Sequence, residues 1–345
     1  MDAHAARTRI GLSAAVIALA VALVVAPAAV AEPGEIMAAA AASPDGSRLV
    51  GVGERQGRTV DLAIHSAAMD AVITVKVLLP VDDSRPAPVL YLLNGANGGT
   101  EASSWNEQTD VADFFADKQV TVVIPMGGRG SYFTDWRADD PVLGRQRWTT
   151  FLTRELPPII DSAFHGTGAN AIAGISMAGT SVFQLALAAP GLYRALGSYS
   201  GCVQTSSPQG EAMVTAVVGR YAGNSVNMWG PPGDPAWAAN DAYLHADRLR
   251  GTAIYVSAGT GLPGPLDTLD GPGVNGNGQK LFSQITTGLV IEAITNQCAQ
   301  ALRTRLAALA VPATFNLRPT GTHSWGYWQQ DLHDSWPLFE QALTR

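Results

Sequence analysis

The hydrophobic residues of this chain fall into short runs separated by polar and glycine-rich segments. Five consecutive apolar residues at 89–93 are typical of a strand that is buried on both faces of a parallel sheet. Residues 73–79 instead alternate apolar with polar, as in an outer strand. On this basis we predict strands at residues 73–79, 89–93, 120–124, 171–175, 195–199, 253–256 and 313–317.

Helical periodicity appears between these strands. We predict helices at residues 145–164, 177–188 and 292–309. Strands that alternate with helices indicate an α/β fold with a mostly parallel central sheet and helices on both faces. Residues 203–250, which have no regular pattern, and residues 259–280, which hold seven glycines, are predicted insertions over the carboxyl edge of the sheet, where α/β active sites lie.

The first 31 residues differ from the rest of the chain. Arg7 and Arg9 precede an apolar run at residues 14–25, and Ala29-Val30-Ala31 has the small residues of a cleavage site. This pattern predicts a secretory signal peptide at 1–31, because the run is shorter than the ~20 residues of a membrane anchor. We expect a flexible segment at 32–48, a single α/β domain at 49–345 with no membrane span, and a secreted or cell-envelope location.

The composition limits the classes of function. The chain is 47% hydrophobic and 15% charged, which suits a large buried core, and its net charge of −7 without a basic cluster argues against nucleic acid as a partner. Its two cysteines, Cys202 and Cys298, form a candidate disulfide in an exported protein, with two free buried thiols as the alternative. No metal site or cofactor is predicted, because neither the cysteines nor the histidines have metal-ligand spacing.

A candidate nucleophile follows the predicted strand at 171–175. There the chain reads Gly174-Ile175-Ser176-Met177-Ala178-Gly179 and then continues as a helix. A strand, a sharp turn with small neighbours and a helix are the context of a nucleophile elbow, which would expose the Ser176 hydroxyl above the sheet. Ala178 stands where the strict motif has glycine, so the match is relaxed. The alternative is an ordinary serine cap on the helix.

A serine nucleophile needs a general base. His323 follows the last predicted strand, late in the chain. The α/β-hydrolase fold, to which a nucleophile elbow belongs, places its catalytic residues in the order serine, acid, histidine, and we therefore predict a single α/β-hydrolase domain at 49–345. The remaining histidines lie in the predicted signal peptide or on segments far from any expected partner: His4, His65, His165, His245 and His333.

The acid that would orient His323 lies between the strand at 253–256 and the histidine. The sequence offers Asp267, Asp270 and Glu292 in this interval, and spacing alone does not choose among them.

An oxyanion hole needs two backbone amides that point at the developing charge. The first is predicted from Met177, directly after the nucleophile, and the second from Ala96 in the glycine-rich loop at 94–99. An ordinary strand-to-helix turn is the alternative role of that loop.

Seven short segments together resemble mycolyltransferases of the antigen 85 type, in order and spacing from about residue 70 to the end. The segments are Ile124-Pro125-Met126-Gly127-Gly128, Tyr132-Phe133-Thr134-Asp135-Trp136, Phe151-Leu152-Thr153-Arg154-Glu155, Gly174-Ile175-Ser176-Met177-Ala178, Met228-Trp229-Gly230-Pro231, Asp234-Pro235-Ala236-Trp237 and Gly321-Thr322-His323-Ser324-Trp325.

This resemblance implies an exported acyltransferase. Such enzymes move a mycoloyl chain from trehalose monomycolate to a sugar acceptor, trehalose or cell-wall arabinogalactan, through a seryl ester. Carried over by position, Ser176 is the nucleophile and His323 the base. The acid of the family is a glutamate in a Phe-Leu-Glu segment, which corresponds to Val290-Ile291-Glu292 and makes Glu292 the expected acid.

The chain departs from the family in the loop after the strand at 89–93. The family has Asp-Gly-Leu-Arg, whose charged residues contact trehalose, and this chain has Asn94-Gly95-Ala96-Asn97. We therefore name Asn94, Asn97, Ser324 and Trp325 as candidate substrate-binding residues. A secreted carboxylesterase that uses water as acceptor, and a non-catalytic relative that binds carbohydrate or matrix, are the alternative functions.

Overall fold

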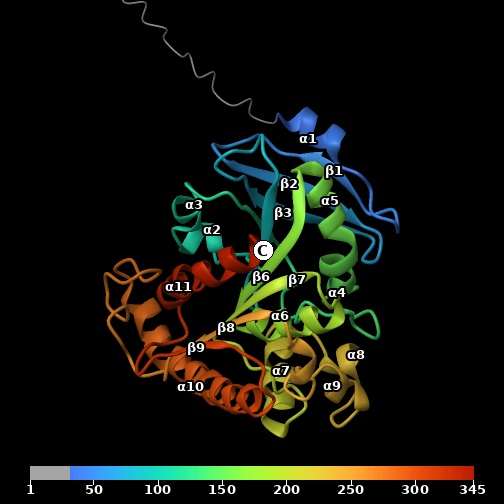
Figure 1. Ribbon diagram of the computed structural model, residues 1–345. Coiled ribbons are helices and arrows are strands. Elements are labelled where there is room, and N and C mark those ends of the chain that lie inside the picture. Colours follow the sequence, from blue (N-terminus) through green and yellow to red (C-terminus); the bar gives the residue numbers. More distant parts are fainter. Residues whose placement is uncertain (1–31) are drawn as a thin grey trace, which may run out of the picture.

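The computed structural model describes residues 32–345, so the predicted signal peptide at 1–31 lies outside the described residues. One nine-stranded sheet runs through the molecule in the order β1-β2-β3-β5-β4-β6-β7-β8-β9, with helices on both faces (Figure 1). This arrangement confirms the predicted α/β fold. The strands are β1 (Arg48–Val52), β2 (Thr59–Ser66), β3 (Ala71–Leu78), β4 (Ala87–Leu93), β5 (Thr121–Pro125), β6 (Gly166–Ile175), β7 (Tyr193–Tyr199), β8 (Ala253–Ala258) and β9 (Thr314–Leu317).

The helices follow the strands along the chain as the sequence pattern predicts, with several additions. They are α1 (Pro33–Ala39), α2 (Trp105–Gln108), α3 (Val111–Phe114), α4 (Trp148–Thr150), the π-helix η1 (Phe151–Glu155), α5 (Leu156–Ala163), α6 (Met177–Ala188), α7 (Pro208–Arg220), α8 (Ser225–Trp229), α9 (Pro235–Ala239), the 3₁₀-helix η2 (Ala246–Leu249), α10 (Gly278–Ala308) and α11 (Trp325–Leu343).

The sheet has an antiparallel part and a parallel part. Strands β1, β2, β3 and β5 pair antiparallel, whereas β5, β4, β6, β7, β8 and β9 pair parallel. The carboxyl ends of the parallel strands therefore meet at one edge. That edge receives the turn after β6, the turn after β7 and the turn after β8, which supply the site described below.

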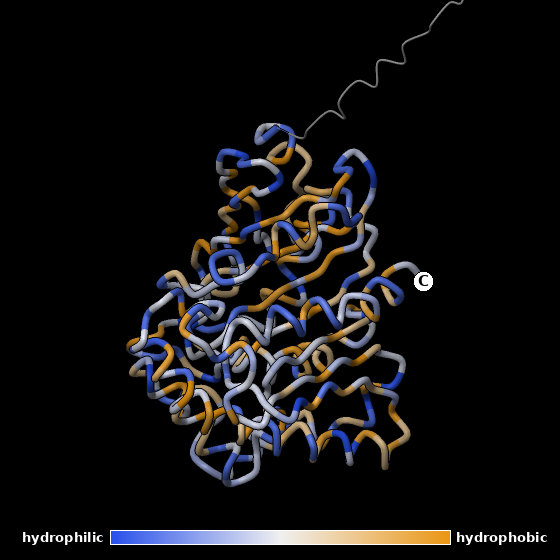
Figure 2. Tube along the Cα trace, turned by 90° about the vertical axis from the view of Figure 1, so that its left-hand side faces the viewer, coloured by the Kyte–Doolittle hydropathy of each residue, from blue (hydrophilic) through white to orange (hydrophobic). Residues whose placement is uncertain are grey.

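Successive side chains of the central strands alternate between two cores. In β4, Val89 and Tyr91 belong to the core beneath α5, α6 and α10, while Leu90 and Leu92 belong to the core beneath α2, α3 and α11. All four are fully buried. Burial on both sides explains why β4 is a continuous apolar run, and Figure 2 shows such hydrophobic segments along the strands with hydrophilic ones at the loops.

Helix α11 closes one face of the sheet. It packs against β6, β7 and β8, and in Figure 1 it lies across the sheet near the C-terminus. Its buried residues Trp328, Leu332, Trp336 and Phe339 recur every three or four positions, which is the period of one helix face.

Residues 32–48 differ from the expected flexible segment, because they contain α1 and hold it against the domain. Pro33 stands at the start of the helix, where its fixed φ suits a first helical turn. Ile36 is 1% exposed and joins the core. The amide of Ala41 donates to Ser162 Oγ at 2.8 Å. A single apolar anchor in an alanine-rich stretch gives no periodic signal, so the sequence pattern did not predict this helix.

The two predicted insertions have different structures. Residues 203–250 contain α7, α8, α9 and η2, and the buried Trp229 and Trp237 fix the two short helices α8 and α9 to the core. The glycine-rich segment has no helix or strand from residue 259 until α10 begins at Gly278. Helix α10 begins 14 residues before the predicted start at Glu292, and exposed residues such as Phe282 in this first half hide its amphipathic period.

Among residues 32–345, no helix combines the length and the apolar character that crossing a bilayer would need.

Candidate active site

The turn between β6 and α6 holds Ser176 in a strained backbone conformation. Ser176 has φ +55° and ψ −121°, in the region that side chains disfavour. The turn is tight, since a Cβ on Gly174 would lie 2.8 Å from the Cβ of Ala178. The Ser176 side chain makes no capping bond to α6, so its hydroxyl is not used as a helix cap.

The Ser176 hydroxyl meets the imidazole of His323. Ser176 Oγ lies 2.8 Å from His323 Nε2, and His323 Nδ1 lies 2.8 Å from Glu292 Oε2. Both distances are those of good hydrogen bonds. When the serine donates to Nε2, the Nδ1–H donates to the carboxylate. This is the tautomer that a serine nucleophile needs from its base.

Glu292 is fully buried and each of its oxygens has a donor. Oε1 accepts a hydrogen bond from Ser200 Oγ at 2.8 Å and from the Gly259 amide at 2.6 Å, while Oε2 faces His323. A buried carboxylate is tolerated only with such partners. These bonds fix the carboxylate in one orientation toward the imidazole.

The structure brings Glu292, and neither of the other two candidate acids, to His323. Asp267 accepts hydrogen bonds from Gly264, Gln284, Thr322 and Tyr327. Asp270 is exposed in the glycine-rich loop.

Residues that the sequence reasoning missed surround this triad. Trp328 donates from Nε1 to Ser200 Oγ at 3.0 Å, and its ring packs edge-on against His323 with centroids 4.9 Å apart. Ser200 directly follows β7, and Gly259 directly follows β8. Their positions at the carboxyl edge of the sheet were the signal that could have identified them.

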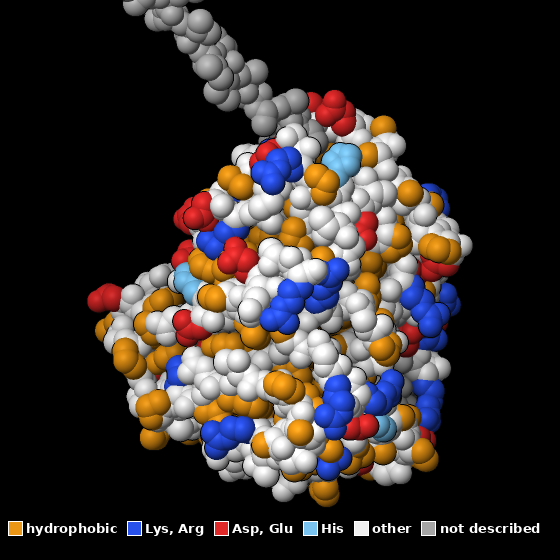
Figure 3. Space-filling view, viewed as in Figure 1, with side chains coloured by type: hydrophobic (Ala, Val, Ile, Leu, Met, Phe, Trp, Pro, Cys, Tyr) orange, Lys and Arg blue, Asp and Glu red, His pale blue; other side chains and the backbone are white. Residues whose placement is uncertain are grey.

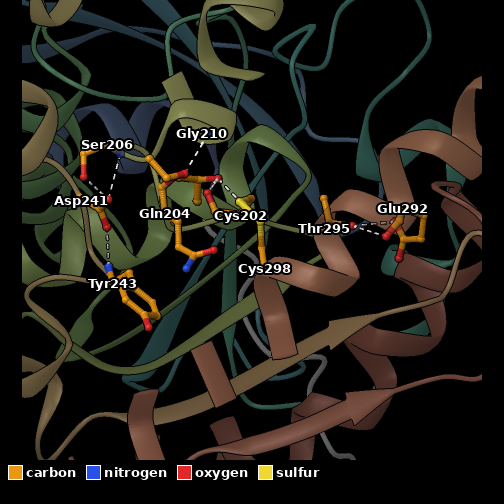
Figure 4. The surroundings of a disulfide bond; sticks show 11 residues. Cys202, Gln204, Ser206, Gly210, Asp241, Tyr243, Glu292, Thr295 and Cys298 are labelled. Carbon is orange, nitrogen blue, oxygen red and sulfur yellow. Dashed lines mark hydrogen bonds between the residues drawn. A yellow bond between two sulfur atoms is a disulfide. The ribbon is translucent and has the colours of Figure 1, made fainter. Parts of the chain in front are cut away.

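A disulfide bond joins Cys202 and Cys298, with Cα atoms 5.1 Å apart. Figure 4 shows the bond with Cys298, Thr295 and Glu292 on the same helix, α10. Cys202 lies two residues after Ser200, which is itself a donor to Glu292. The bond thus ties the helix of Glu292 to the segment whose Ser200 donates to the Glu292 carboxylate.

The predicted oxyanion hole consists of the amides of Met177, which directly follows Ser176, and of Ala96 in the loop at 94–99. A Cβ on Gly95 would lie 3.7 Å from Ser176 Cβ, which places the loop at 94–99 against the elbow. Within residues 32–345, neither amide donates a backbone hydrogen bond, and the first amide of a helix has no partner inside it. Two donors are left for a ligand, and the oxyanion hole stays a prediction.

Asn94 does not face a ligand, which contradicts its predicted role in substrate binding. Its side chain is fully buried. Nδ2 donates to the carbonyl of Pro125 at 3.3 Å and Oδ1 accepts from the Trp105 amide at 3.2 Å. Asn94 therefore fastens the end of β4 to β5 and α2, a role that a short polar side chain at a strand end fills by hydrogen bonding.

The other candidate binding residues differ in their access to solvent. Asn97 is half-buried, and its side-chain amide is hydrogen-bonded within its own turn. Nδ2 donates to the carbonyl of Thr100 at 2.8 Å, and Oδ1 accepts from the backbone amide of Gly99 at 3.2 Å. Ser324 is 6% exposed. Trp325 is half-buried between Trp105 and Trp328, so part of its ring is open to a ligand.

A second buried carboxylate lies behind the site. Asp331 of α11 pairs with Arg318, which follows β9. Burial raises the pKa of Asp331 to about 6, although the guanidinium opposes that rise. Asp331 thus titrates well above the range of an exposed aspartate.

Charged side chains are scattered over the face of the molecule in Figure 3, with Lys and Arg interspersed among Asp and Glu. Within residues 32–345, no group of three His, Cys, Asp or Glu residues has the arrangement of a metal site.

The chain is similar in sequence to one described family and to several known proteins. A family model described as "Putative esterase" matches residues 66–339. Diacylglycerol acyltransferase/mycolyltransferase Ag85A of Mycobacterium leprae is 33% identical over 74% of this chain and 76% of its own length. The protein of the same name from Mycobacterium ulcerans is 32% identical over 86% of each chain.

Solved structures with similar folds agree with the α/β architecture. MPT51 of Mycobacterium tuberculosis superposes with a TM-score of 0.66 at 22% identity, over 82% of this chain and 97% of that one. An S-formylglutathione hydrolase from Agrobacterium tumefaciens superposes with a TM-score of 0.57 at 15% identity, over 86% and 99%. At these identities the likeness concerns the fold.

Proposed function

Because this chain belongs to the esterase family and is a relative of the antigen 85 mycolyltransferases, we propose that it is an exported serine acyltransferase. It moves mycoloyl groups from trehalose monomycolate to a sugar hydroxyl, of trehalose or of cell-wall arabinogalactan, outside the cell or in its envelope. The observation that carries this proposal is the pair of 2.8 Å contacts that link Ser176 through His323 to Glu292.

The reaction begins with attack by the serine. His323 takes the Ser176 proton at Nε2 while the oxygen bonds to the ester carbonyl carbon of the donor. Glu292 stabilises the imidazolium that forms and does not itself take the proton. The amides of Met177 and Ala96 stabilise the tetrahedral oxyanion, and a donor of this kind contributes about 2.7–4 kcal/mol to lowering the barrier.

Collapse of the tetrahedral intermediate and a second attack return the enzyme to its starting state. His323 gives its proton to the departing trehalose oxygen, which leaves a seryl ester on Ser176. A sugar hydroxyl then enters, loses its proton to His323 Nε2 and bonds to the ester carbonyl carbon. The bond from that carbon to Ser176 Oγ breaks as His323 returns the proton to Oγ, which releases the acylated sugar. The partly open Trp325 ring beside His323 supports a place for the sugar, because aromatic rings pack against the apolar faces of sugars.

The experiment is incubation of the mature protein with trehalose monomycolate and excess labelled trehalose, followed by mass spectrometry. Labelled dimycolate supports the transferase, and Ser176→Ala should remove it. If neither labelled dimycolate nor free mycolic acid appears, and Ser176→Ala matches the unaltered protein, the acyltransferase proposal is wrong.

A secreted carboxylesterase is the second candidate. The loop after β4 supports it, because Asn94 is buried and the Asn97 amide is used within its own turn. The loop therefore lacks the charged acceptor contacts that the antigen 85 resemblance implies. In the same experiment, free mycolic acid without labelled dimycolate would favour water as the acceptor.

A further inference from the structure

The position of His323 depends on contacts from a distant part of the chain. The histidine lies in the short connection between β9 and α11. The Gly321 amide donates to Leu262 O at 2.7 Å, and the His323 amide donates to Gly288 O at 3.3 Å. Both acceptors belong to the glycine-rich loop or to the first half of α10. The connection is thus held from the side on which Glu292 lies.

One carboxylate, that of Asp267, links these segments. It accepts from the Gly264 amide at 2.7 Å, from Gln284 Nε2 at 2.6 Å and from Tyr327 OH at 2.8 Å, and also from the Thr322 hydroxyl. A carboxylate has about four acceptor sites. The four donors, which come from four segments, therefore occupy all the acceptor sites of the Asp267 carboxylate.

The segments that Asp267 joins are those that carry the base and the acid. Thr322 is fully buried and directly precedes His323. Gln284 lies on α10, eight residues or about two turns before Glu292. Because both are bonded to the same carboxylate, a displacement of α10 relative to the histidine connection would break at least one of these bonds.

The packing around Asp267 leaves little room for rearrangement. A Cβ on Gly264 would lie 2.6 Å from Tyr327 OH, and a Cβ on Gly259 would lie 2.4 Å from Gly321 O. The glycines of this loop are thus needed where its backbone touches the histidine connection. Burial and the neighbouring Asp267 raise the pKa of Tyr327, so the phenol stays protonated and donates a hydrogen bond to Asp267.

We propose that Asp267 is the positioning residue of the active site: it sets the distance between Glu292 on α10 and His323 by binding Gln284 and Thr322 at once. It acts through these residues, and it does not touch the reacting atoms. This inference rests on the proposed serine mechanism and deepens it.

The test compares Asp267→Asn with Asp270→Asn. An asparagine has one oxygen to accept and places an NH₂ group toward two of the four donors, so it breaks the cluster without changing size. Asp270 is exposed in the same loop and gives the matched control. The readouts are kcat/KM on a water-soluble nitrophenyl ester, with its pH profile, and the rate at which a fluorophosphonate labels Ser176.

For the folded Asp267→Asn protein at 25 °C we expect kcat/KM and the labelling rate to fall about 10- to 100-fold, as expected for a displaced base. The midpoint of the pH profile should shift, and Asp270→Asn should match the unaltered protein. A purely structural Asp267 would lower the melting temperature and leave the rate and the pH midpoint unchanged, and that result would overturn the proposal.

Thr322 supplies a second pair of variants in case Asp267→Asn does not fold. Thr322→Val should slow labelling, and Thr322→Ser, which keeps the hydroxyl, should restore it. Combined with Asp267→Asn, Thr322→Val should add little, because both variants disrupt the same hydrogen-bonded cluster. If the losses in labelling rate of Thr322→Val and Asp267→Asn added fully in the double variant, the two residues would not position His323 together, and the proposal would be wrong.

Failure of the serine mechanism has a different signature. In that case the unaltered protein is not labelled, or Ser176→Ala still hydrolyses the ester. Asp267 is then tested by proton NMR of the His323 Nδ1–H that faces Glu292. Its downfield resonance should be present in the unaltered protein and in Asp270→Asn, and broadened in Asp267→Asn. An unchanged resonance in Asp267→Asn would reject the positioning role.

Discussion

Loss of the Cys202–Cys298 disulfide should lower stability by a large and calculable amount. The two residues are 96 positions apart, so the bond closes a loop of about 100 residues. In the chain-entropy model, a loop of this length stabilises the folded state by about 4.7 kcal/mol. For Cys202→Ala combined with Cys298→Ala we therefore expect the free energy of unfolding to fall by about 4–5 kcal/mol.

The assay is urea unfolding followed by tryptophan fluorescence, which the eight tryptophans make sensitive. The unaltered protein in reducing agent is the control, because it loses the bond but keeps both buried sulfur atoms. The difference between the reduced protein and the double variant then measures the packing of those atoms alone. A loss below about 1 kcal/mol in the double variant, with an unchanged slope against urea, would refute the loop-closure reasoning.

Further predictions concern the triad, the elbow and the buried ion pair. Glu292→Gln should reduce kcat on a soluble ester by about 10⁴-fold with little change in fold, because the histidine loses its orienting charge; a loss under tenfold would contradict the assigned acid. Gly174→Val should cost about 1–3 kcal/mol in urea unfolding, since its side chain would overlap Ala178; Gly219→Val in α7, where a Cβ meets no atom within 4 Å, controls for the loss of glycine. The pKa of Asp331, about 6, is above that of an unfolded aspartate, about 3.9, so the stability that it contributes is present below pH 4 and lost as the pH rises through 6. Relative to Asp331→Asn, the unaltered protein should lose up to about 3 kcal/mol between pH 4 and pH 7, and parallel curves of melting temperature against pH would contradict this.

Much of the fold could be predicted because the buried parallel strands leave a strong pattern. Helix α6 begins and ends where the sequence predicts, and β4 contains the whole predicted run at 89–93. Elements with weaker patterns were missed. The first half of α10 carries exposed apolar residues, and α1 has only Ile36 as an anchor, so neither has the one-sided hydrophobic face from which helices are predicted.

The candidate site also contains residues that a local sequence pattern identifies and residues that only distant contacts identify. The tight turn at Ser176 could be predicted because it demands small residues at fixed positions. The contact of Ser176 with His323 could be expected because the histidine follows the last strand. Spacing left Asp267, Asp270 and Glu292 equivalent, and the family resemblance pointed to Glu292. In the structure, contacts across α10 and the histidine connection separate them. The burial of Asn94 also depends on contacts with Pro125 and Trp105, which are distant in sequence.

The place of α11 in the chain has a consequence for the timing of synthesis. His323 and α11 follow every strand of the sheet, and α11 covers the face formed by β6, β7 and β8. A chain emerges from the ribosome or the export channel N-terminus first, and domains fold as units. A growing chain therefore holds Ser176 without His323 and a sheet whose face beneath α11 is still open. The Ser176–His323 contact and the final burial of that face are completed together, at the end of synthesis.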